Sequence, residues 1–252
     1  MLSSDGRCKA LDSSADGYVR AEACGMLRIV NKVKFDNSRS NYHVVLAGAV
    51  ANQDGRSSSL TAPNGPAQNE VICDTIRVSG SSEPVTVLQL HGTGTMLGDP
   101  IEMSAALSAL SSSQALTCSL VTGATKTMMG HSEPASGMAS IFAASASLQC
   151  AYTHSVSHLR TVNHNVAAVF IRGNNFITVP RQVQSHVSCG IPVSKCASVS
   201  AFAFQGTNAH AMISIVGMTH CKRGGMHSGR SQRRLADSSR LWDLPLSTTR
   251  LA

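Results

Sequence analysis

Residues 85–100 read VTVLQLHGTGTMLGDP, a largely apolar run that leads into a glycine-rich loop. The stretch 85–90 has the length and composition of a strand buried in a sheet. His91 follows this strand directly, and the glycines beside it allow backbone and ligand to approach closely. The segment therefore predicts a strand whose carboxyl end presents a histidine to a pocket. An isolated His-Gly is more often a loop histidine that bonds to its own turn, and this alternative stays open here.

Strands and helices alternate on both sides of this segment. Further strands are predicted at 44–50, 119–124, 197–204 and 210–216, and helices at 66–78, 100–110 and 134–150. Such alternation indicates parallel strands joined by right-handed crossovers, with ligands gathered at the carboxyl ends of the strands. We therefore expect an α/β fold.

The helix that follows the glycine-rich loop carries a start signal. Asp99 can cap this helix, Pro100 suits its first position, and Glu102 can reach back to complete a capping box. We therefore expect both carboxylates to bond to the amide groups of their own helix.

A second histidine precedes the helix expected at 134–150, in the run from Lys126 to Pro134. A helix N-terminus disfavours the imidazolium, so a neutral His131 could donate a hydrogen bond to a carbonyl oxygen. His91 and His131 at adjacent strand ends would then polarise one carbonyl. Lys126 and Glu133 are expected either to support this loop as an ion pair or to form an ordinary surface pair.

A third segment, FAFQGTNAH at 202–210, places a Gly-Thr-Asn turn between two apolar strands. Such a turn can aim backbone N–H groups at a developing oxyanion. It can equally be a plain hairpin, because glycine and asparagine are common turn residues.

Charge and apolar density divide the chain in two. The formal net charge is +7, and the basic residues are concentrated after Gly217, where apolar residues become sparse. We expect a folded domain over 1–216 and a basic, Ser/Arg-rich, disordered tail over 217–252. A tail of this composition is more often a solvated extension than a ligand for nucleic acid, so no nucleic-acid partner is expected.

The eight cysteines include no C-x-x-C pair, which indicates neither a zinc ribbon nor a redox dithiol. They favour a reducing compartment, the cytoplasm or the plastid. No signal peptide or membrane-spanning stretch is predicted, so we expect no membrane partner. His154 and His158 lack a third ligand, and no nucleotide-binding glycine motif is present. We therefore expect no metal and no bound cofactor.

In this order, five groups of motifs resemble the β-ketoacyl synthase domain of type I polyketide synthases and multifunctional fatty acid synthases. They are DGYVR at 16–20, NQDGR at 52–56 with LTAPNGP at 60–66, HGTGTMLGDP at 91–100, 126–137, and 202–210. The resemblance runs from about residue 3 to about residue 215. It implies an incomplete thiolase-like layered α/β fold, consisting of the end of the first half and most of the second half.

The resemblance also implies a decarboxylative Claisen condensation, with malonyl carried on the phosphopantetheine of an acyl carrier protein. His91 and His131 would be the catalytic histidines that hold the malonyl thioester carbonyl, and Lys126 would order the site with Glu133. The remaining implied site residues are Phe202, Phe204, Gly206, Thr207 and Asn208 for the oxyanion hole and acyl pocket, and Thr93 and Thr95 for the substrate loop.

The family's nucleophile is a cysteine upstream of the segment that contains Asp16, and we expect none in this chain. Cys8 and Cys24 match non-catalytic positions of the family pattern. The resemblance therefore implies a truncated synthase, with the acyl carrier protein as partner and a possible homodimer or pairing with other synthase domains. Two alternatives are a non-catalytic partner that binds the carrier protein or a full-length synthase, and a residual malonyl decarboxylase.

Overall fold

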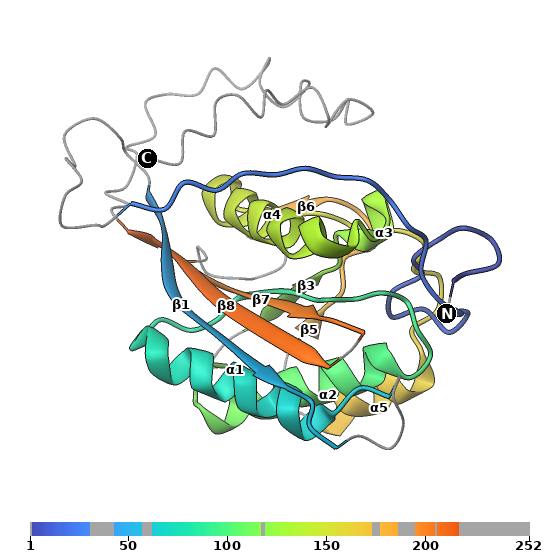
Figure 1. Ribbon diagram of the computed structural model, residues 1–252, viewed down its shortest axis with the longest axis horizontal. Helices are drawn as coiled ribbons and strands as arrows, with labels where there is room; N and C mark the ends of the chain where they lie inside the picture. The colour runs from blue at the N-terminus through green and yellow to red at the C-terminus, as the bar shows by residue number, and fades with distance from the viewer. Residues whose placement is uncertain are drawn as a thin grey trace, which may run out of the picture. The chain divides into compact units, whose positions relative to one another are not determined.

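The computed structural model describes residues 2–30, 43–56, 62–116, 119–172, 177–185, 195–204 and 206–216 (Figure 1). The tail predicted at 217–252 lies outside these residues, so it stays a prediction, as does the domain boundary. One compact unit consists of Met1–Met26 and Val44–Ile215. A second unit, Leu27–His43 with Val216–Ala252, lies almost wholly outside the described residues, and the following concerns the first.

In the described part of the chain, a mixed sheet of six strands has the order β1-β8-β7-β2-β3-β5. The strands are β1 (His43–Gln53), β2 (Val87–Gln89), β3 (Leu120–Gly123), β5 (Ile177–Thr178), β7 (Cys196–Phe202) and β8 (Thr207–Val216). β2 pairs in parallel with β3 and with β7, and β3 pairs in parallel with β5. β8 returns antiparallel to β7. The predicted strands and the parallel pairing are thus confirmed. β4 (Tyr152–Thr153) and β6 (Gln184–Ser185) form a separate antiparallel pair.

Helices cover both faces of the larger sheet. Figure 1 shows α1 (Gly65–Ser79), α2 (Gly98–Ser112) and α5 (His164–Arg172) below the sheet, and α4 (Ser136–Cys150) above it. α4 follows the short helix α3 (Lys126–Met129) and a 3-10 turn at Glu133–Ala135. The three predicted helices are confirmed, whereas α5 was not predicted.

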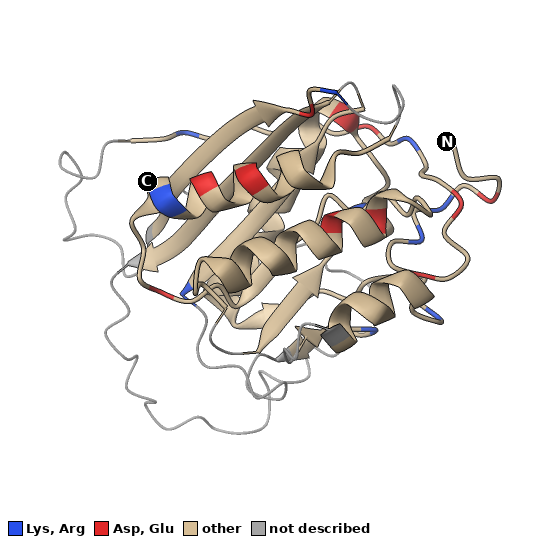
Figure 2. Cartoon of the chain, turned by 90° about the horizontal axis from the view of Figure 1, so that it is seen from below, with Lys and Arg blue, Asp and Glu red and all other residues tan. Residues whose placement is uncertain are grey.

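Charge is excluded from the sheet. None of the described strands contains Lys, Arg, Asp or Glu, and charged residues lie on helices and loops (Figure 2). Leu88, Met103, Leu110 and Leu120 are fully buried between the sheet and the helices below it. Among the described residues, no helix is long and apolar enough to cross a membrane.

The capping box predicted for α2 is wrong. Leu97 occupies the N-cap position and makes no side-chain capping hydrogen bond. Asp99 instead accepts hydrogen bonds from the backbone N–H groups of Leu11 and Gly94, at 2.7 and 3.1 Å. Glu102 accepts from those of His91 and Gly92, at 2.6 and 2.9 Å. Both carboxylates are buried against the glycine-rich loop, whose amide groups need acceptors where water cannot reach.

Candidate active site

The two predicted histidines lie side by side. His91 follows β2, and His131 follows β3 and α3, so parallel pairing places both at the same edge of the sheet. Their ring centroids are 5.4 Å apart, with an angle of 84° between the ring planes. The arrangement that the sequence predicts, two imidazoles converging from separate loops, is therefore present.

Hydrogen bonds fix the tautomer of each ring. The backbone N–H of Phe202 donates to Nδ1 of His91 at 3.2 Å, and that of Glu133 donates to Nδ1 of His131 at 3.1 Å. A nitrogen that accepts a hydrogen bond carries no proton, so each neutral ring must carry its proton on Nε2. Neither Nε2 has a hydrogen-bond partner within the described ranges. Each ring therefore has an Nε2–H group with no acceptor among the described residues.

Both rings are neutral at physiological pH. Burial lowers the pKa of His91 well below its usual range, and the positive charge of Lys126 adds to this shift. Burial and then Lys126 lower the pKa of His131 to about 4. α4 begins only at Ser136, beyond the 3-10 turn, so burial is a stronger cause of the shift than the helix N-terminus that the sequence suggests.

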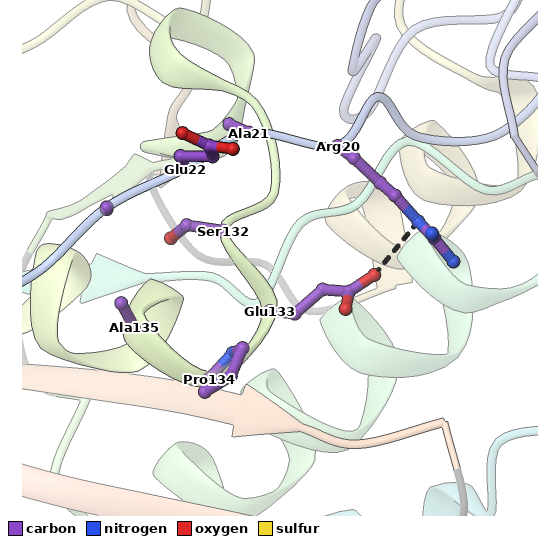
Figure 3. A pocket seen from close by; sticks show the side chains of 8 residues that line it. Arg20, Ala21, Glu22, Ser132, Glu133, Pro134 and Ala135 are labelled. Atoms are coloured by element: carbon purple, nitrogen blue, oxygen red, sulfur yellow. Dashed lines mark ion pairs between the residues drawn. The ribbon is translucent and has the colours of Figure 1, made fainter.

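The expected pair of Lys126 with Glu133 does not form. Lys126 is 2% exposed, and its Nζ has no hydrogen-bond partner in the described structure. Glu133 lies at the surface, where its Oε1 contacts Nε of Arg20 at 3.2 Å (Figure 3). The two residues separate because one side chain points into the interior and the other toward solvent.

Lys126 faces buried carboxylates behind the glycine-rich loop. Burial lowers the pKa of Lys126 to about 8, although the carboxylates of Glu102 and Asp99 act in the opposite direction. Burial raises the pKa of Glu102 to about 7 and that of Asp99 to about 6. The loop that carries His91 thus rests on a buried cluster of charged groups. Glu102 and Asp99 were not predicted as site residues, although the glycine-rich loop beside them offers unpaired amide groups to buried carboxylates.

The two predicted phenylalanines have different environments. The ring of Phe202 is 9% exposed and lies 5.8 Å from that of His91, at 48°. Phe204 is 52% exposed. The structure therefore brings Phe202, but not the side chain of Phe204, to the histidines.

β7 and β8 form a hairpin, which is the second of the two structures that the sequence left open for this turn. The backbone N–H of Gly206 donates to Ala203 O at 3.1 Å, so it is not free for an oxyanion. Thr207 Oγ1 accepts a hydrogen bond from Gln53 at 2.9 Å. Asn208 donates to side-chain oxygens of Asn52 and Asp54 on the β1 side, at 3.1 and 2.8 Å. The polar side chains of Thr207 and Asn208 therefore join β8 to β1 and do not enter the site.

The glycine-rich loop is packed under the N-terminal segment. A side chain at Gly94, whose φ is +80°, would place its Cβ 2.6 Å from Lys9 N. Thr95 Oγ1 accepts a hydrogen bond from Gly98 N at 3.1 Å, and Thr93 is half-buried in the loop. The N–H of Gly17 donates to Gly94 O at 2.9 Å. The contact between the motif around Gly17 and this loop was not predicted from the sequence.

The described cysteines offer no activated thiol beside the histidines. Cys8 is buried, and its sulfur accepts a hydrogen bond from Val19 N at 3.3 Å. Burial raises the pKa of Cys8, opposite to the change that makes a nucleophilic thiolate. Cys24 is exposed. Within the described ranges, no group of His, Cys, Asp and Glu side chains could hold a metal ion.

A surface pocket of about 320 Å³ opens next to the backbone of His131. Residues 20–23 line one wall and residues 132–135 the other (Figure 3). Neither histidine ring lines this pocket. This pocket is therefore separate from the paired rings.

Family models match both parts of the chain. The model described as "Beta-ketoacyl synthase, C-terminal domain" matches residues 43–160, and "Beta-ketoacyl synthase, N-terminal domain" matches residues 1–33. The chain is 41% identical over 217 residues to a phenolphthiocerol/phthiocerol polyketide synthase of Mycobacterium tuberculosis (strain CDC 1551 / Oshkosh), covering 84% of this chain and 13% of that protein.

Solved ketosynthases have the same fold. An oxazolomycin ketosynthase domain of Streptomyces albus, OzmH KS7, superposes with a TM-score of 0.71 at 24% identity, covering 85% of this chain and 37% of that one. The ketosynthase from module 6 of the bacillaene synthase of Bacillus subtilis 168 gives 0.69 at 25% identity, covering 85% and 38%. The thiolase-like layered α/β fold is thus confirmed, over little more than a third of the length of these structures. The comparisons give no support to a plastid location.

Proposed function

Because the chain belongs to the β-ketoacyl synthase family, represented by polyketide synthases, we propose that it carries the malonyl-activating part of a ketosynthase site. The observation that supports this proposal is the pair of neutral rings 5.4 Å apart, each with its Nδ1 occupied by a backbone N–H. Two Nε2–H groups are then available for one substrate oxygen.

The proposed substrate is a malonyl thioester on the phosphopantetheine of an acyl carrier protein. His91 and His131 donate hydrogen bonds from Nε2 to the thioester oxygen. The bond between the methylene carbon and the carboxylate breaks, its electron pair forms the enolate, and carbon dioxide leaves. Negative charge then grows on the oxygen that the two rings hold, and a single preorganised donor of this kind contributes roughly 10²- to 10³-fold in rate.

Condensation is the second part of the proposed reaction. In a complete site of the family, the enolate carbon attacks the carbonyl carbon of an acyl group held as a thioester on the family's cysteine, and the cysteine leaves as a thiolate. We expect no such cysteine in this chain, so this step needs the thiol of a complete synthase. Phe202 is proposed to line the acyl pocket because its ring already contacts His91. Thr93 and Thr95 are proposed to contact the phosphopantetheine arm.

A homodimer or other synthase domains are proposed as further partners, and a reducing compartment such as the cytoplasm as the location.

Release of carbon dioxide tests this proposal. The purified chain is incubated with malonyl-acyl carrier protein labelled in the free carboxylate, and labelled carbon dioxide and acetyl-acyl carrier protein are measured. We expect release by the wild-type chain, at least 100-fold less with His91→Ala, and no loss with His164→Ala, which removes an exposed histidine at the start of α5. Equal release by the His91→Ala variant would overturn the proposal.

A second candidate function is a non-catalytic partner that binds the carrier protein or a full-length synthase. It is favoured by the burial and raised pKa of Cys8, since no activated thiol lies beside the histidines in the described structure. Binding of malonyl-acyl carrier protein without release of carbon dioxide would support this function over the first.

A further inference from the structure

The two histidines have matching surroundings. Each ring accepts a backbone N–H at Nδ1, and each lies against an aromatic ring. For His91, Phe202 supplies both the N–H and the ring. For His131, Glu133 supplies the N–H, and the ring is that of Tyr18, with its centroid 5.1 Å away and its plane at 66°. Tyr18 is therefore placed on His131 much as Phe202 is placed on His91.

The residues after Tyr18 bind the backbone of His131 on both sides. The N–H of His131 donates to Val19 O at 2.8 Å, and the N–H of Ala21 donates to His131 O at 3.0 Å. Arg20 and His131 thus form an isolated parallel bridge. Because both backbone groups are bonded, the segment Tyr18–Ala21 fixes the position from which the imidazole extends.

The side chain of Arg20 holds Glu133, the residue whose backbone N–H donates to Nδ1 of His131. Glu133, which donates its N–H to Nδ1, has a φ of +48°, a left-handed conformation that residues other than glycine seldom adopt. Its carboxylate is held by Arg20 at 3.2 Å, as Figure 3 shows. An exposed ion pair adds little to stability, but this one limits the conformations open to Glu133.

We propose that Tyr18 and Arg20 are positioning residues that hold His131 with its proton on Nε2 and its ring turned toward the substrate. This inference rests on the proposed function of His131. Tyr18 excludes water from the ring and restricts its rotation, while Arg20 keeps the N–H of Glu133 on Nδ1. Both residues act through His131 and touch no reacting atom.

Nitrogen NMR of the histidine rings in the full, unloaded chain tests the proposal without depending on turnover. In the wild type, His131 is expected as the Nε2–H tautomer through neutral pH. Tyr18→Leu should raise the pKa of His131 by roughly one unit, because water reaches the ring, and should populate the Nδ1–H tautomer. Tyr18→Phe, which keeps the ring, should restore the wild-type spectrum. The titratable groups around His131 are Lys126, His91, Glu133, Arg20 and Tyr18 itself.

Arg20→Ala should also populate the Nδ1–H tautomer, and Arg20→Lys should populate it less. The matched controls are Tyr152→Leu on β4 and Arg77→Ala on α1, which remove an exposed aromatic ring and an exposed ion pair elsewhere. Neither control should change the His131 signals. Far-ultraviolet circular dichroism verifies that each variant is folded, and if Tyr18→Leu does not fold, Arg20→Ala carries the test.

Unchanged tautomer and pKa of His131 in folded Tyr18→Leu or Arg20→Ala would overturn the positioning role of the residue replaced. Release of carbon dioxide gives an independent readout, and Tyr18→Leu should lower it roughly tenfold or more through kcat rather than KM. If the wild-type chain releases no carbon dioxide, the proposed function fails, while the NMR result still decides how His131 is held.

Discussion

The carboxylate of Glu102 accepts a hydrogen bond from the backbone N–H of His91 at 2.6 Å, and its other oxygen accepts one from Gly92 at 2.9 Å. A side chain in the first turns of α2 therefore sets the course of the backbone that carries the first histidine. The contact is buried, so no water can replace it.

Glu102→Gln tests this contact. Glutamine keeps the length of the side chain, but its amide nitrogen cannot accept a hydrogen bond, so one loop N–H loses its partner. We expect the free energy of unfolding to fall by about 1–3 kcal/mol and release of carbon dioxide to fall at least tenfold. Denaturant unfolding and the release assay measure the two effects. Glu70→Gln, at an exposed position of α1, is the control, and equal behaviour of the two variants would show that the contact is unimportant.

Lys126→Met tests why the histidines are neutral. The ammonium of Lys126 disfavours a second positive charge on His131, whose pKa is about 4. Removing the ammonium should raise that pKa, yet burial should keep it below 6.5, the usual value. A pH titration of the His131 NMR signals measures the change, with Lys195→Met at an exposed site as control. A fall in the pKa would contradict the electrostatic explanation.

The lowered pKa of Asp12 should make the free energy of unfolding depend on pH in the acid range. Burial raises its pKa, but hydrogen bonds from Ser14, Thr161 and Arg160 outweigh this effect and bring it to about 2, below the ordinary 3.8. The folded state therefore stays ionised where the unfolded state begins to bind protons. The stabilisation, on the order of 1 kcal/mol, should be complete above about pH 5 and be lost as the pH falls toward 2.

Asp12→Asn should remove that part of the acid dependence. Unfolding free energies of wild type and variant, measured between pH 2 and pH 6, should differ most at the upper end and converge at the lower end. A constant difference over the whole range would contradict the assignment to Asp12. The same bonds connect Asp12 to residues 160 and 161, so the variant should also loosen the N-terminal segment.

Phe202 and Phe204 form a matched pair for testing the hairpin. Phe202→Ala should lower the free energy of unfolding by about 2–4 kcal/mol, because this ring is 9% exposed and packs on His91. Phe204→Ala should change it by no more than about 0.5 kcal/mol, because this ring is 52% exposed. Chemical denaturation compares the two. A larger loss for Phe204 than for Phe202 would contradict the described packing.

The helices and strands could be predicted well, because the residues that start, end and pattern each of them lie close together in the sequence. The Asn64-Gly65-Pro66 start of α1 is an example, since Asn64 Oδ1 accepts a hydrogen bond from Ala67 N at 3.3 Å. The convergence of His91 and His131 was also predictable, because parallel strands bring their carboxyl ends to one edge. Helix α5 was not predicted, although its apolar residues at 166, 169 and 170 recur at helical spacing.

Contacts between distant segments could not be predicted in this way. Glu102 has the spacing of a capping box, but the N–H groups of a buried loop compete for it and prevail. Glu133 lies near Lys126 in sequence, yet pairs with Arg20 from the N-terminal segment. The partner of each carboxylate depends on which side chains the fold buries. The spacing of residues along the sequence does not contain this information.

Infrared difference spectroscopy tests the central claim most directly. A carrier protein bearing an acetyl thioester, labelled with carbon-13 at the carbonyl, binds without turning over. Two Nε2–H donors should shift the carbonyl stretch to lower frequency, His91→Ala and His131→Ala should each lose part of the shift, and the double variant should lose all of it. A shift that persists in the double variant would show that these two rings do not hold the thioester oxygen.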